Sequence, residues 1–199
     1  MRGLFNPESG LWRLMGYFGD AVVLSLLWLL FSVPVVTLGP ATAALYDCAV
    51  HNLRRGEDDL PGRFWRSFRR DWKIGAVTTL LWLAVTVTPP VLLYQGARRG
   101  APGVLLGALV LLAFFLLALG CWVFPLLSRF TLSFAALQST AVRLGLGHIL
   151  RSAALAALVP ATLWLCLRFI VPTFFLPAAA ALLASLLIEP VFAQYENRE

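Results

Sequence analysis

Charged residues are scarce in this 199-residue sequence: Asp, Glu, Lys and Arg together make up 13% of it, whereas 60% of the residues are hydrophobic. Soluble globular domains carry about 25% charged and about 45–50% apolar residues. A soluble fold would therefore leave too little polar surface to cover the core. The composition excludes an ordinary soluble domain and predicts that a lipid bilayer is the solvent of this protein.

Cysteine and histidine are also rare. Cys48, Cys121 and Cys166 stand alone in apolar segments and no CxxC pair occurs, so the sequence predicts neither a zinc site nor a disulfide framework. His51 and His148 are the only histidines, too few and too isolated for a two-histidine metal motif. The GxSxG, P-loop and HExxH motifs are missing. We therefore expect no cofactor, no metal site, no catalytic residues and no enzymatic activity.

Long apolar runs are what the sequence has in abundance. Twenty helical residues cover about 30 Å of hydrocarbon, and the alternating segments of a transmembrane β-barrel are absent. We predict an all-α, polytopic transmembrane helical bundle that forms a single integral membrane domain over residues 1–199. A short helix at 41–54 would add a sixth span if it crossed the membrane. The five expected spans are residues 21–38, 74–94, 103–127, 152–171 and 172–188.

The distribution of Arg and Lys predicts the orientation. With five spans, the side of the membrane that holds residues 39–73 receives eleven of the 16 basic residues and the other side receives five. The positive-inside rule places the richer side in the cytoplasm. We expect a multi-pass protein of the bacterial plasma membrane with its N-terminus outside and its C-terminus in the cytoplasm. Because no soluble module presents these cations, we expect no nucleic-acid partner.

A two-sided pattern marks residues 61–73, where aromatic residues recur on one helical face and basic residues on the other. This pattern is typical of an amphipathic helix lying in the headgroup region of a bilayer with anionic lipids. A juxtamembrane loop whose charges only fix the topology is the alternative. Residues 134–151 show a weaker version of the pattern. The expected membrane contacts are Arg63, Phe64, Trp65, Arg66, Phe68, Arg70, Trp72 and Lys73.

The stretch SVPVVTLGPATAALYDCAV, residues 32–50, interrupts an apolar run. Pro34 ends or kinks a helix, and Pro40 suits the first turn of a new one. Gly39 between them can adopt a positive φ without penalty. Lipid cannot satisfy non-helical backbone, so the break is either a turn at the cytoplasmic surface or a sheltered polar break like those of transporters.

Polar side chains follow the break closely. The hydroxyls of Thr37 and Thr42 can cap freed backbone N–H groups. Asp47 is an acid in an apolar segment, which makes it a candidate for a functional role, but His51 at the i, i+4 position makes a local surface ion pair sufficient to explain it. The candidate polar site consists of Pro34, Thr37, Gly39, Pro40, Thr42, Tyr46, Asp47 and His51.

Four stretches of the sequence resemble the YesL-like family of bacterial integral membrane proteins, which is built on a domain of unknown function. The resemblance covers nearly the whole chain and is densest over residues 31–76. Ser25 and Asp71 stand where family members tend to carry Asn, which weakens the transfer of a polar role to either. The four stretches are FN (5–6), SVPVVTLGPATAALYDCAVHNLRRGED (32–58), FWRSFRRDWKIGA (64–76) and FPLLSRFTLSFAALQSTAVRL (124–144).

This resemblance implies a plasma-membrane protein that is often encoded beside carbohydrate-uptake ABC transporters, with no established activity and no catalytic residues. We therefore expect a non-enzymatic accessory or regulatory membrane protein whose partners are the lipid bilayer and, through the family, ABC sugar transporter subunits. The alternative is a small transporter or channel in which residues 34–47 line a polar break.

Overall fold

The computed structural model describes the fold of residues 10–196 and the side-chain packing of residues 15–193. The FN motif at residues 5–6 lies outside the described residues. Within them the chain is helical and contains no β-strand, which confirms the predicted all-α class. The α-helices are α1 (Gly10–Ser32), α2 (Leu38–Cys48), α3 (Leu60–Arg98), α4 (Gly103–Arg129), α5 (Phe134–Gly147), α6 (Ile149–Arg168) and α7 (Leu176–Glu196).

Three short elements complete the description: the 3₁₀ turns η1 (Val35–Thr37) and η3 (Val171–Phe174), and the π-helical segment η2 (Ala49–Arg54). Five of the described helices, α1, α3, α4, α6 and α7, are long and apolar enough to cross a membrane. The prediction of a multi-pass helical protein is confirmed. The possible sixth span at residues 41–54 folds as α2 and η2, and eight of the eleven residues of α2 are buried in the protein.

Helix boundaries differ from the sequence prediction. The last two expected spans, 152–171 and 172–188, are α6 and α7 with η3 between them, and two further differences concern the first span and the basic segment. The first span begins at Gly10 and ends at Ser32, so residues 33–38 are not part of it. The expected interfacial helix at 61–73 is not a separate element, because α3 continues without interruption from Leu60 to Arg98. No proline stands between the basic and the apolar halves of α3, so nothing stops its backbone hydrogen bonding there. Its 39 residues extend about 58 Å, which exceeds the roughly 30 Å hydrocarbon thickness.

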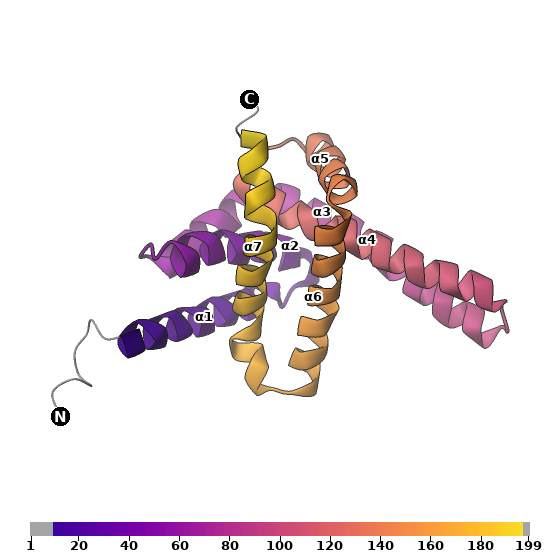
Figure 1. Cartoon of the computed structure of the whole chain (residues 1–199), viewed down its shortest axis with the longest axis horizontal. Helices are drawn as coiled ribbons and strands as arrows, with labels where there is room; N and C mark the ends of the chain where they lie inside the picture. Colours follow the sequence, from indigo (N-terminus) through magenta and orange to yellow (C-terminus); the bar gives the residue numbers. More distant parts are fainter. Residues whose placement is uncertain (1–9, 197–199) are drawn as a thin grey trace.

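Three arms extend from a common centre (Figure 1). The α3–α4 hairpin points in one direction, the α6–α7 hairpin in a second and α1 in a third. At the centre, α2 contacts α1, α3, α4 and α7. One buried cluster forms around Trp122 between α4 and the C-terminal helices. A second forms around α2 and includes Leu24 of α1 and Phe64 of α3. The helix break therefore lies where the arms meet.

Candidate site at the helix break

The chain leaves α1 after Ser32 and restarts as a helix at Leu38. Pro34 is extended, with φ −76° and ψ 122°, because its ring and missing N–H prevent the helix from continuing. Pro40 occupies the first turn of α2, where a missing N–H costs no helical hydrogen bond. The predicted sequence of helix, stop, connector and new helix is confirmed.

The threonine hydroxyls near the break act as donors to carbonyl groups. Thr37 Oγ1 donates to the carbonyl oxygens of Phe31 and Pro34, both at 2.6 Å. Thr42 Oγ1 donates to Leu38 O at 2.7 Å and accepts a hydrogen bond from the indole of Trp28 at 3.2 Å. The expectation that these hydroxyls cap N–H groups is wrong. A helix that stops leaves unpaired carbonyls at its C-terminal end, and the Thr37 hydroxyl binds one of them.

Gly39 is required for close packing and not for a special backbone conformation. It has no positive φ, so that part of the sequence interpretation is also wrong. A Cβ atom at Gly39 would lie 2.9 Å from the carbonyl oxygen of Gly75 and 2.5 Å from a ring carbon of Phe124. A Cβ atom at Gly75 would lie 2.8 Å from Cγ of Pro40. Small residues at such crossings let helix backbones approach closely, and here they join α2 to α3.

Tyr46 connects α2 to the last helix. Its hydroxyl donates to Glu189 Oε1 of α7 at 3.4 Å, and Glu189 Oε2 lies 3.7 Å from Arg129 Nη1 at the end of α4. Tyr46 is 3% exposed. Burial, together with the neighbouring carboxylate of Glu189, raises the pKa of Tyr46, so this hydroxyl remains a donor at neutral pH.

Asp47 connects the break to the start of α3. His51 Nδ1 lies 3.2 Å from Asp47 Oδ1 and 2.9 Å from the Asp47 carbonyl oxygen, so the local pair expected from the i, i+4 spacing is present. Arg63 of α3 approaches Asp47 Oδ2 at 3.8 Å and also pairs with Glu57. The Asp47 side chain is only 12% exposed. The pair is therefore largely enclosed, and its additional cation comes from α3 rather than from neighbouring Arg54.

Burial governs the ionisation of this region. It raises the pKa of Asp47, while the positive charges of His51 and Arg63 oppose the shift. It also raises the pKa of the Cys48 thiol to about 12, and the charge of Asp47 adds to that rise. A thiol with such a pKa is almost entirely protonated at pH 7, so Cys48 is a poor nucleophile.

A third polar contact, between α3 and α4, was not predicted. Arg70 binds Asp71 through two hydrogen bonds, Nε to Oδ1 at 2.9 Å and Nη2 to Oδ2 at 2.8 Å. The same Nη2 donates to the Ser128 carbonyl oxygen at 2.8 Å. Asp71 is 7% exposed. The sequence gave no sign that Arg70, next to Asp71, would contact α4. Glu189, by contrast, could have been identified from the sequence, because it is an isolated acidic residue in an apolar run.

Part of the expected membrane-contact face lies inside the protein. Phe64 and Phe68 are 1% and 7% exposed and pack against Phe31 of α1, with ring centroids 5.6 and 5.0 Å apart. Their expected contact with lipid is corrected, because α1 covers the aromatic side of α3. Trp65 and Trp72 are 50% and 43% exposed, so their contact with lipid stays a prediction.

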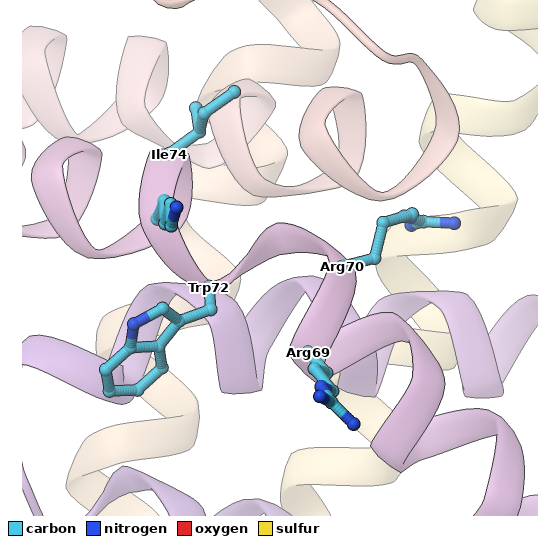
Figure 2. Close-up of a pocket in the computed structure, with 5 residues that line it drawn as sticks. Arg69, Arg70, Trp72 and Ile74 are labelled. Carbon is cyan, nitrogen blue, oxygen red and sulfur yellow. The ribbon is translucent and has the colours of Figure 1, made fainter.

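Two hollows in the described surface are lined by residues outside the helix break. One of about 470 Å³ borders α3 and is lined by Arg69, Arg70, Trp72, Lys73 and Ile74 (Figure 2). Another of about 480 Å³ is apolar and lies between α4 and α6. Among the side chains of residues 15–193, no three His, Cys, Asp or Glu groups are placed to hold a metal ion. The polar side chains of the break thus form internal hydrogen bonds and one titratable pair, Asp47 and His51.

Comparison with known proteins gives one family match. Residues 21–94 match the sequence model of a family described as "Protein of unknown function, DUF624". This segment contains most of α1, the helix break, η2 and α3 as far as Tyr94. Curated proteins and solved structures give no match. The segment that carries the candidate site is thus similar to DUF624, a domain to which no activity is assigned.

Proposed function

We propose that this chain is a non-enzymatic accessory membrane protein in which the helix break is a packed junction that positions three apolar arms. One observation carries the proposal: the polar side chains of the break bind one another or the backbone inside the protein. Thr37 binds carbonyls at the end of α1, Tyr46 binds Glu189, and Asp47 binds His51 and Arg63. Together with the ion pair between Arg129 and Glu189, these contacts join α1, α3, α4 and α7, as a junction requires.

The arms supply the surface on which such a protein would act. Val104 and Leu111 of α4 are 87% and 71% exposed, and Leu167 of α6 is 85% exposed. Helices in lipid associate through van der Waals packing and interhelical hydrogen bonds, since lipid tails are as apolar as the side chains. Arms that diverge from one junction leave such faces available to the helices of another membrane protein.

The proposed partner is a membrane subunit of an ABC sugar transporter, which rests on the resemblance to the YesL-like family. The proposed location is the bacterial plasma membrane, with the N-terminus outside and the C-terminus in the cytoplasm. The excess of Arg and Lys on the side of residues 39–73 supports that orientation.

Site-specific photocrosslinking in intact cells tests the proposal. A photoreactive amino acid at Leu111 or Leu167 should form covalent adducts with transporter membrane subunits, identified by mass spectrometry. The same amino acid at exposed Arg55, outside the apolar arms, is the control and should give no such adduct. Adducts with lipid alone at both arm positions would contradict the proposed partner.

A small transporter or channel is the second candidate, and one observation favours it. Asp47, His51 and Arg63 form an enclosed charged group beside the break, which is the kind of group found on ion pathways in membrane proteins. The substitution Asp47→Asn separates the candidates when tested in cells that lack the gene. A stable, well-expressed variant that restores the deletion phenotype supports the accessory role, whereas failure to restore it supports transport.

A further inference from the structure

We propose that Arg69 and Lys73 of α3, together with Trp72, bind the phosphate of an anionic phospholipid. The proposal concerns a lipid site on one face of one helix and is independent of the proposed protein partner. It rests on three observations: these two cations have no acidic partner among the described residues, a hollow lies beside them, and exposed apolar side chains follow on the same face of α3.

The basic residues in the N-terminal part of α3 fall into two sets, those that pair with a described acidic side chain and those that do not. Arg63 pairs with Glu57 and Asp47, Arg66 pairs with Asp59 at 3.0 Å, and Arg70 pairs with Asp71 at 2.8 Å. Arg69 and Lys73 are exposed, and no acidic side chain within the described part of the chain lies within ion-pairing distance of either. These two positive charges therefore remain available to an external anion.

The two free cations are neighbours in space. Their i, i+4 spacing puts them on one face of the α-helix, and both line the hollow of about 470 Å³ beside α3. In Figure 2, Arg70 points away from Trp72, in the direction of its contact with α4. Trp72 is 43% exposed and also lines the hollow. An indole beside free cations is typical of the membrane–water interface, where its amphipathic ring sits at headgroup level.

The same face of α3 becomes apolar toward the middle of the helix. Val77 follows Lys73 by one turn and is 56% exposed, and Leu80 and Leu81 in the next turn are 51% and 41% exposed. A phosphate held by Arg69 and Lys73 would thus have acyl chains along exposed aliphatic side chains. This continuity selects a phospholipid over free phosphate, because the apolar stretch would gain nothing from a soluble anion.

Native mass spectrometry of the purified full chain in mild detergent tests the site. The protein is titrated with phosphatidylglycerol, and separately with phosphatidylcholine as the zwitterionic reference. The double variant Arg69→Gln/Lys73→Gln should bind phosphatidylglycerol on the order of thirtyfold more weakly than the wild type, because each of the two cations contributes about 1 kcal/mol near a lipid surface. The matched control Arg98→Gln/Arg99→Gln removes two exposed cations from the opposite end of α3 and should change the affinity less than about twofold.

Two further measurements keep the proposal falsifiable if the double variant is unstable. Wild-type protein should retain phosphatidylglycerol in preference to phosphatidylcholine, and that preference should weaken as salt increases. Excess inorganic phosphate should not displace the lipid, since it lacks the acyl contacts; displacement would identify a free-phosphate site instead. Equal retention of the two lipids, or equal loss of affinity in the test and control variants, would overturn the proposal.

Discussion

The carbonyl oxygen of Gly75 on α3 lies 2.9 Å from the point that a Cβ atom on Gly39 of α2 would occupy. The two helices cross closely here, directly after the break that Pro34 introduces, and the side chains of Thr79 and Phe124 also border the space beside Gly39. The crossing joins the shortest α-helix of the described chain to the longest. This close crossing explains why position 39 is a glycine although its backbone has no positive φ.

Gly39→Ala should therefore destabilise the protein by overpacking. Inserting a methyl group into a tightly packed contact typically costs about 1–3 kcal/mol, and the melting temperature in detergent should fall accordingly. Gly19→Ala is the matched control, because a Cβ atom there meets nothing within 4 Å. The control should be neutral or slightly stabilising, since alanine favours helices over glycine by roughly 0.5–1 kcal/mol. Equal melting temperatures for Gly39→Ala and the wild type would disprove the close crossing.

Arg70→Met should cost more stability than Asp71→Asn. Without Arg70, the carboxylate of Asp71 remains buried and unpaired, at a cost of about 1–3 kcal/mol. Asp71→Asn keeps a neutral acceptor for the half-exposed guanidinium and leaves its bond to the Ser128 carbonyl in place. Thermal unfolding of both variants and of the double variant measures the coupling between the two residues. Additive effects would show that Arg70 and Asp71 do not stabilise the fold as a pair.

Asp47→Asn should be at least as stable as the wild type at pH 7. The folded-state pKa of Asp47 is raised by burial, so above that pKa the carboxylate is less favourable in the folded than in the unfolded chain. The free energy of unfolding of the wild type therefore rises as the pH falls through the folded-state pKa of Asp47 toward the pKa of an ordinary aspartate. It falls again as the pH rises. Melting curves between pH 7 and 4 should show the advantage of the variant shrinking on acidification. If Asp47→Asn were clearly less stable than the wild type at pH 7, the ionised carboxylate would stabilise the folded protein and the prediction would be contradicted.

Orientation is tested with cysteines at two exposed positions of ordinary backbone conformation. Arg99→Cys, at the end of α3, should react with a membrane-impermeant maleimide in intact cells. Arg55→Cys, after η2, should react only once the cells are permeabilised, because the segment of residues 39–73 is proposed to be cytoplasmic. Labelling of Arg55→Cys from outside would invert the proposed topology.

The sequence was sufficient to predict the helical class, the presence of five long apolar helices and the stop at Pro34, because these depend on composition and on local backbone chemistry. It did not predict that α1 covers Phe64 and Phe68, since an amphipathic aromatic face has the same pattern against lipid and against another helix. Nor did it predict the reason for Gly39. A close helix crossing depends on Gly75, 36 positions away, and no local pattern connects the two residues.

The polar contacts show the same division. The Asp47–His51 pair could be predicted because its i, i+4 spacing lies within one helical segment. The approach of Arg63 and the contact of Tyr46 with Glu189 depend on how α2 packs between α3 and α7. The sequence alone identifies these side chains as polar groups in apolar surroundings but does not identify their partners.

The central claim, that the break is a closed junction, is tested most directly by the reactivity of Cys48. This thiol lies in α2 beside Asp47, is 0% exposed and has its pKa raised to about 12. Native membranes are treated with N-ethylmaleimide near pH 7, and modification of each cysteine is followed by peptide mass spectrometry, with Arg55→Cys as the exposed reference. We expect Cys48 to stay unmodified until detergent denaturation while the reference reacts fully. Modification of Cys48 in the folded protein at the rate of the reference would show that water reaches the break and would contradict the account.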